Sequence, residues 1–114
     1  MADVHTWVAR IRGFCNAKID PSSRFYAGPF RVGTTAKICD LYIKNAGENA
    51  DRINIKVSEF VGGMENVLQH LVTDSVVNPG AVVHIPIEVT VPDRPGTWNL
   101  GVKVWCTEET EPSW

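Results

Sequence analysis

The regular alternation of apolar and polar residues in the second half of the chain constrains its fold more than any other feature. In residues 81–91 every second residue is apolar: Ala81, Val83, Ile85, Ile87, Val89 and Val91. Successive side chains of a β-strand point to opposite faces, so this spacing is typical of a strand with one buried face. Pro86 interrupts the run and has no N–H to donate to a neighbouring strand. We therefore predict a long strand that lies at a sheet edge or bends at Pro86.

A second alternating run follows the turn Pro-Asp-Arg-Pro-Gly at residues 92–96. Turns of this composition end a strand and reverse the chain. One face of the next strand carries Trp98, Leu100, Val102, Val104 and Cys106, and the other carries Asn99, Gly101, Lys103, Trp105 and Thr107. The pattern predicts two antiparallel neighbours, joined either as a hairpin or by a crossing between sheets.

The middle of the chain repeats the alternation. Residues 39–44 and 53–57 predict two further strands, separated by a turn at residues 45–50. Residues 64–72 fit both helical and strand spacing; the surrounding short strands favour a strand, and one helical turn near Met64–Val67 remains an alternative. Asn78-Pro79-Gly80 predicts a turn.

The first 35 residues are less regular. Val4–Ile11 predicts a strand with Trp7, Ala9 and Ile11 facing inward, and residues 13–35 mix Gly, Pro, Ser and Arg with little periodicity. A loop of that length is uncommon in a compact domain, so we expect at least one short strand within it, with brief pairing at residues 30–32. The whole chain, residues 1–114, is predicted to be one all-β domain: an immunoglobulin-like, two-sheet antiparallel sandwich of about seven strands. A barrel is the usual alternative for such a strand count.

Charge and hydropathy argue against several functions. The net charge is −2 and the eleven basic residues are scattered, which argues against nucleic acid as a partner. No apolar run is long enough to cross a membrane, and the first residues lack the apolar core of a signal peptide. We expect either a cytoplasmic protein or a surface or virion protein whose leader has been removed. Residues 107–114 form an acidic tail with three glutamates.

No pattern of catalytic residues is present. The three histidines and three cysteines have no metal-ligand spacing, and there is no nucleophile elbow or phosphate-binding glycine loop. We therefore expect no enzyme activity, no metal and no cofactor.

Aromatic residues are the candidate binding residues. Trp98 is predicted to face the core, whereas Trp105, its neighbour Lys103, and Tyr42 are predicted to face outward. Exposed aromatics can stack on sugars or dock a protein; the alternative is that a loop or the tail covers Trp105. In the usual strand order Tyr42 and Trp105 lie on different sheets and cannot form one platform.

Self-association is the other candidate. Edge strands have unpaired backbone groups, and the tail could add to a neighbour's sheet with Trp114 as its anchor. The alternative for the tail is a frayed terminus.

Several segments together resemble the CARDB-like group of bacterial and archaeal immunoglobulin-like domains, over residues 36–106. A strand ends in Asn-Ala-Gly within residues 40–50, and the strand 53–57 follows it. The turn Asn-Pro-Gly at 78–80 precedes the strand 83–87. The pattern closes at residues 95–104 with Pro-Gly-Thr-Trp-Asn-Leu-Gly-Val-Lys-Val. The resemblance implies a sandwich module of the kind found as spacers, adhesive units or sugar-associated units of surface proteins.

Two alternatives remain for Cys39 and Cys106, which both fall on the inward register of their strands. They form an inter-sheet disulfide as in immunoglobulin domains, or they remain free buried thiols together with Cys15. For function we predict a non-catalytic protein-interaction or structural module, an assembly, surface or virion component with protein partners that include a second copy. The alternative is a carbohydrate-binding module that uses Trp105 or Tyr42.

Overall fold

The computed structural model describes residues 3–114, which form nine β-strands and no helix. The strands are β1 (Val4–Gly13), β2 (Ala17–Ile19), β3 (Arg24–Phe25), β4 (Phe30–Arg31), β5 (Thr35–Asn45), β6 (Ile53–Val61), β7 (Met64–Val72), β8 (Val82–Thr90) and β9 (Gly96–Cys106). Six of them are long and three are short, where the alternation predicted about seven.

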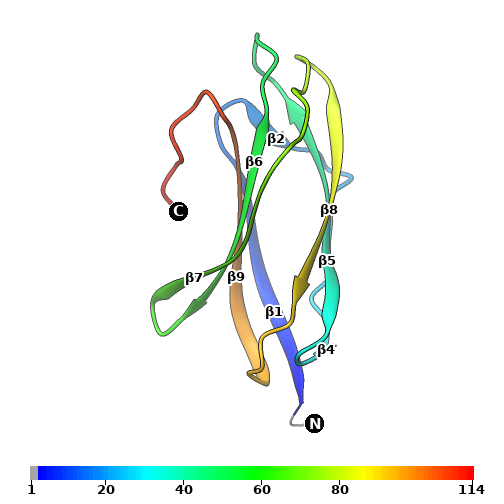
Figure 1. Cartoon of the computed structure of the whole chain (residues 1–114), viewed down its shortest axis with the longest axis vertical. Coiled ribbons are helices and arrows are strands. Elements are labelled where there is room, and N and C mark those ends of the chain that lie inside the picture. The colour runs from blue at the N-terminus through cyan, green and yellow to red at the C-terminus, as the bar shows by residue number, and fades with distance from the viewer. Residues whose placement is uncertain (1–2) are drawn as a thin grey trace.

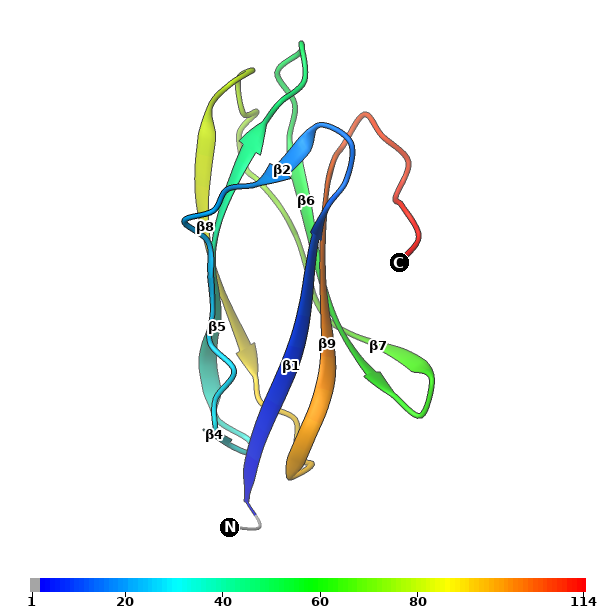
Figure 2. The ribbon, with the colours of Figure 1, turned by 180° about the vertical axis from the view of Figure 1, so that it is seen from behind.

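The strands form two sheets that face each other as two layers (Figures 1 and 2). The five-stranded sheet has the order β4-β1-β9-β6-β7. In the four-stranded sheet, β5 pairs with β8 along its length and also with β2 and β3. The prediction of an all-β fold with two sheets is confirmed.

The expectation of wholly antiparallel sheets is wrong at one pair. β1 and β9 run parallel, in a register from His5 opposite Gly96 to Gly13 opposite Val104. Parallel neighbours need a long connection, and here the rest of the fold separates the first long strand from the last. Figure 2 shows the two strands side by side, both rising from the end of the molecule that carries the N-terminus.

The predicted strands of the second half are present, and the structure decides how they are connected. Among the described residues β8 pairs only with β5, so it is the edge strand that Pro86 predicted. The turn at 92–96 crosses between sheets, because β8 and β9 belong to different ones. β6 and β7 form a hairpin through Gly62 and Gly63, which both have positive φ, a conformation that favours glycine. The alternative of a helical turn near Met64–Val67 is therefore wrong.

The N-terminal third contains more pairing than its sequence indicates. β1 places Trp7 fully in the core, with Ala9 and Ile11 packed against it as predicted. Phe30 pairs with His5 in the short strand β4, and β2 and β3 pair with β5. These short strands cover sheet edges that would otherwise be open.

The core lies between the two layers and follows the predicted alternation. Side chains from β5, β6, β8 and β9 that are almost fully buried include Leu41, Ile43, Ile53, Ile55, Val57, Ile87, Leu100, Val102 and Val104. Burying each such side chain contributes about 1.5–3 kcal/mol. Trp98 is partly buried and packs against this core.

Candidate interaction surface

Three of the four outer sheet edges are protected against further pairing. β4 pairs with the start of β1, and the Trp7 N–H donates to the Ala27 carbonyl at 3.1 Å. β2 and β3 cover part of the free side of β5. β8 carries Pro86, which lacks the N–H that an added strand would need. Natural sheets block their edges in these ways.

Neither a pairing strand nor a proline of the described chain blocks the outer edge of β7. Within residues 3–114, β7 pairs with β6 alone and ends the five-stranded sheet. Its nine residues include neither proline, lysine nor arginine, and Glu65 is its one acidic residue. A long edge strand without these residues is a template for pairing with another chain. We refer to the backbone edge of residues 64–72 that points away from β6 as the β7 edge.

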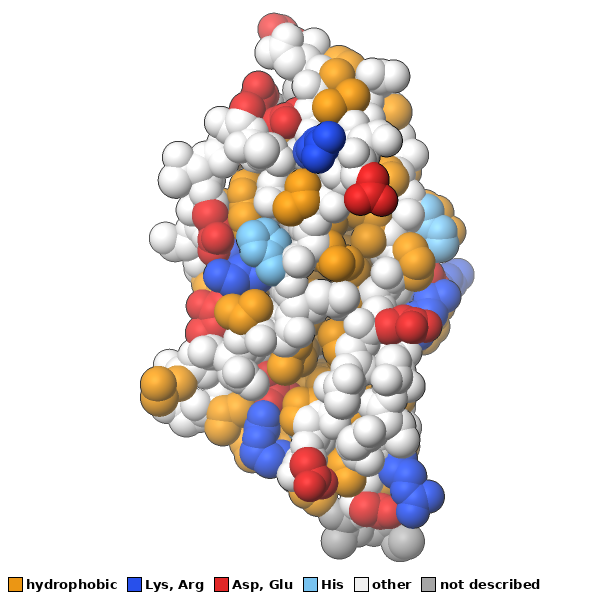
Figure 3. All heavy atoms as spheres, viewed as in Figure 1, with side chains coloured by type: hydrophobic (Ala, Val, Ile, Leu, Met, Phe, Trp, Pro, Cys, Tyr) orange, Lys and Arg blue, Asp and Glu red, His pale blue; other side chains and the backbone are white. Residues whose placement is uncertain are grey.

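Apolar side chains are concentrated at the β7 edge. Of the seven large hydrophobic side chains that are exposed in the described part of the chain, three lie on β7: Met64 (75% exposed), Val67 (48%) and Val72 (45%). The β6–β7 hairpin projects from the body of the molecule in Figures 1 and 2, and hydrophobic atoms lie at its tip in Figure 3. The register with β6 places Val67 and Val72 on one face of the sheet and Met64 on the other, so β7 exposes apolar side chains on both of its faces.

A groove lies between β7 of the five-stranded sheet and β8 of the four-stranded sheet. It has a volume of about 630 Å³ and is lined by Thr35, Gln69, Leu71, Pro86, Glu88, Val89 and Thr90. The Oε1 atom of Gln69 is buried and has no hydrogen-bond partner in residues 3–114. Buried acceptors are normally satisfied, so the groove contains an unused hydrogen-bonding group beside apolar surface.

The expectation that Trp105 is exposed is wrong. Its side chain is only 4% exposed, and Lys103 is also buried. The ring of His70 lies 5.5 Å from that of Trp105, and the Lys103 Nζ lies 5.6 Å from its centroid. The indole is buried and lies beside His70 and Lys103 of the same sheet, so it offers no platform to a ligand.

The acidic tail folds back onto the outer face of the five-stranded sheet. The Lys103 Nζ donates to the Glu111 carboxylate at 2.9 Å and to the Pro112 carbonyl at 2.7 Å. Lys56 also bonds Glu111, at 3.1 Å, and the two lysines lower the pKa of Glu111. The alternative of a frayed terminus is therefore wrong for this tail.

Trp114 sits in a slot of its own chain. A Cβ on Gly101 would lie 2.7 Å from the Trp114 ring and 2.9 Å from the Phe60 ring. The Trp114 and Phe60 rings are 5.4 Å apart and nearly perpendicular, and the Trp114 indole N–H donates to Glu65 at 3.2 Å. The predicted anchor for a partner is thus occupied within the same chain.

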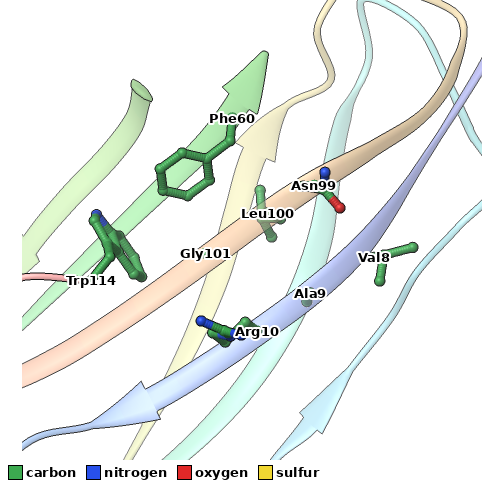
Figure 4. Close-up of a pocket in the computed structure, with 8 residues that line it drawn as sticks. All are labelled: Val8, Ala9, Arg10, Phe60, Asn99, Leu100, Gly101 and Trp114. Atoms are coloured by element: carbon green, nitrogen blue, oxygen red, sulfur yellow. The ribbon is translucent and has the colours of Figure 1, made fainter. Parts of the chain in front are cut away.

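A second hollow of about 540 Å³ lies beside this slot (Figure 4). Its lining includes Phe60 and Trp114 on one side and Val8 and Arg10 on the other, with Gly101 between them; Ala9, Asn99 and Leu100 complete it. The hollow combines aromatic rings with the exposed polar groups of Arg10 and Asn99.

Tyr42 lies on the other sheet from Trp105, as predicted, so the two cannot form one platform. Its ring stacks on that of His84 at 4.4 Å, and His84 bonds Asp40 at 2.9 Å. Hydrogen bonds from Lys37 and His84 lower the pKa of Asp40 to about 2. Tyr42 is therefore engaged by its own chain on one face.

A buried polar cluster at one end of the sandwich was missed by the sequence analysis. Glu59 accepts hydrogen bonds from the His5 Nε2 at 2.8 Å and the Trp7 indole N–H at 2.5 Å, and it pairs with Arg94. The alternation contained the signal, because His5 and Glu59 continue the inward registers of Trp7 and Val57. His5, Trp7 and Glu59 are almost fully buried, which indicates a structural role.

The sequence predicted that an edge strand could be an interface, but it did not identify residues 64–72 as that strand. The signal was available in residues 64–72, which carry apolar side chains without a clean alternation. A strand with apolar residues on both faces has more apolar surface than one core can bury.

Cys39 and Cys106 are buried in the core and all three thiols are free, as in the second alternative, whereas the expectation that Cys15 is buried with them is wrong. Burial raises the pKa of both thiols to about 12. Cys15 is exposed, although its hydrogen bond with Glu109 also raises its pKa.

We expect Ellman's reagent to titrate one thiol, Cys15, in the native protein and all three after denaturation, because only a thiolate that solvent can reach reacts. A Cys15→Ser variant should leave no rapidly reacting thiol. Rapid reaction of two or more thiols in the native protein would contradict the burial of Cys39 and Cys106. Reaction of only one thiol after denaturation without reductant would contradict their being free.

No family model, curated protein or solved structure matches this chain. Residues 3–114 contain no cluster of three or more potential metal ligands. No helix long and apolar enough to cross a membrane occurs in the same residues.

Proposed function

We propose that this chain is a non-catalytic protein-interaction module that receives an extended segment of another chain along the β7 edge. One observation supports this most directly: β7 has an unprotected edge with exposed aliphatic side chains, while pairing or proline protects the other outer edges. Backbone hydrogen bonds to the edge would provide affinity, and the groove beside Gln69 and Leu71 would select alternate side chains of the segment.

We further propose that the sandwich is of the immunoglobulin-like kind, as its CARDB-like resemblance implies. The two-sheet architecture supports this, as do the connections β5–β6 and β8–β9, which cross from one sheet to the other. Such a module would serve as an assembly, surface or virion component.

A selection from a displayed library of short linear peptides tests the proposed interaction. Selected peptides should bind the wild type at least about tenfold more tightly than a Val67→Lys/Val72→Lys variant, a difference of about 1.4 kcal/mol. Val8→Lys/Val82→Lys is the matched control, because both valines are similarly exposed but lie outside β7. Hydrogen exchange should show new protection in residues 64–72.

Peptides that bind both variants equally well, or that protect other strands, would overturn the proposal.

We propose a carbohydrate-binding function as a second candidate, at the hollow beside Trp114 and not at Trp105 or Tyr42, which were the residues expected from the sequence. Aromatic rings next to the Arg10 guanidinium and the Asn99 amide support it. A glycan array on the wild type and on Trp114→Ala tests it: sugar binding that is lost in Trp114→Ala but retained in Val67→Lys/Val72→Lys would favour this candidate over the first. Absence of sugar binding would count against it.

A further inference from the structure

We infer that the segment received by the β7 edge is β7 of a second copy of this chain, paired antiparallel across a two-fold axis. The inference rests on the proposed function, because it names the partner of the same edge. It joins two five-stranded sheets into one continuous sheet.

The register of β6 with β7 shows which side chains of β7 share a face. Glu65 lies on the outer face, where it contacts Ser58 at 2.6 Å and the Trp114 indole. His70 lies on the same face, beside Trp105. Gln69 and Leu71 lie on the opposite face, which lines the groove.

A bulge in the β6–β7 ladder makes this arrangement possible. The register shifts between Val57 and Ser58, which lie opposite Gln69 and Val67, so Leu68 is the extra residue. Glu65 and His70 are five positions apart, an odd number that would normally place them on opposite faces. The bulge returns them to one face, because it reverses the alternation on either side of it.

An antiparallel register centred between residues 67 and 68 matches residues of the same face. With the two-fold axis between residues 67 and 68, Glu65 of each copy lies opposite His70 of the other, on the outer face. On the inner face Met64 lies opposite Leu71. The same register also brings together the N–H and C=O groups of the two β7 strands that point away from β6. This follows because the side-chain face and the hydrogen-bonding direction of the backbone alternate together along a strand. A slip by one residue would place outer side chains against inner ones.

Charge and exposure fit this register. It places the carboxylate of Glu65 opposite an imidazole, and no like charges of β7 lie opposite each other. Met64 is the most exposed large hydrophobic side chain of the described residues, and here it covers Leu71 at the groove of the second copy. The hairpin projects from the body, so a second hairpin can reach it (Figures 1 and 2).

The symmetry also explains why an unprotected edge does not lead to open-ended aggregation. A two-fold contact uses the same edge on both copies and closes on itself. After pairing, each copy has only its protected edges left.

Sedimentation velocity over a concentration series tests the partner. The wild type and Val8→Lys should form dimers, whereas Val67→Lys should be a monomer over the same range, because two lysines would lie near the two-fold axis. Circular dichroism confirms that the variant is folded. A wild type that stays monomeric, or a Val67→Lys variant that still dimerises, would overturn the self-pairing.

Engineered cysteines test the register. In a Cys15→Ser background, Met64→Cys/Leu71→Cys should give a covalent dimer on oxidation, because opposite residues of antiparallel strands lie within disulfide reach. The single variants Met64→Cys and Leu71→Cys should not cross-link. A dimer that cross-links only through a single variant would overturn this register. The peptide selection separates the two proposals: peptide binding by a strict monomer retains the interaction function and removes only the second copy as its partner.

Discussion

Replacing Glu59 with alanine is expected to lower the free energy of unfolding by about 3–5 kcal/mol, because it breaks a buried, charged hydrogen-bond network. The carboxylate is fully buried and accepts hydrogen bonds from His5 and Trp7, and it pairs with Arg94. The substitution leaves these donors without their acceptor. The cluster lies where β1, β6 and the β8–β9 turn meet, so its loss affects both sheets.

Urea denaturation followed by tryptophan fluorescence measures this effect. Glu88→Ala is the matched control, because Glu88 is an exposed carboxylate on β8 and should change the stability by no more than about 0.5 kcal/mol. Glu59→Gln should lose less than Glu59→Ala, since the amide oxygen still accepts. Equal effects of Glu59→Ala and Glu88→Ala would show that the network contributes nothing to stability.

Gly101→Val is expected to displace the tail and to lower the free energy of unfolding by about 1–3 kcal/mol, the usual cost of overpacking. The new side chain would collide with Trp114 and Phe60, whose atoms lie 2.7 and 2.9 Å from the Cβ position. Displacing Trp114 also weakens the contacts that Glu111 and Pro112 make with Lys103. The buried ammonium group of Lys103 would then lose hydrogen-bond acceptors in the tail.

Limited proteolysis measures the release of the tail. Cleavage within residues 107–114 should be faster in Gly101→Val than in the wild type, because proteases cut unfolded segments. Asn99→Val is the control, since Asn99 lies on the same strand and face but is exposed. Unchanged cleavage in Gly101→Val would mean that Gly101 is not needed to hold the tail.

Strands could be predicted from the sequence more fully than the pairing of their edges. Alternation predicted the strands of the second half and their inward faces, and it predicted from Pro86 that one strand lies at an edge. It did not predict the parallel pairing of β1 with β9. Pairing partners depend on how the chain crosses between sheets, and a strand's own residues do not encode that.

The candidate site shows the same division. An edge strand was predicted as an interface, but Trp105 and Lys103 were expected to be exposed because only their register was known. Register determines the face of a sheet, whereas cover depends on which distant residues return to that face. Here His70 lies beside the buried Trp105, and Glu111 and Pro112 accept hydrogen bonds from the buried Lys103.

By itself, the sequence determined the all-β class, the strands of the second half and which of their side chains face the core, because period-two alternation is a local property of the chain. The tertiary structure alone decided which edge remains open, where the acidic tail lies and how a buried glutamate is satisfied. Each of these depends on contacts between residues far apart in sequence, such as Glu59 with His5 or Gly101 with Trp114. The period-two alternation therefore constrains the fold, while the proposed function depends on β7, a strand in which a bulge interrupts the alternation.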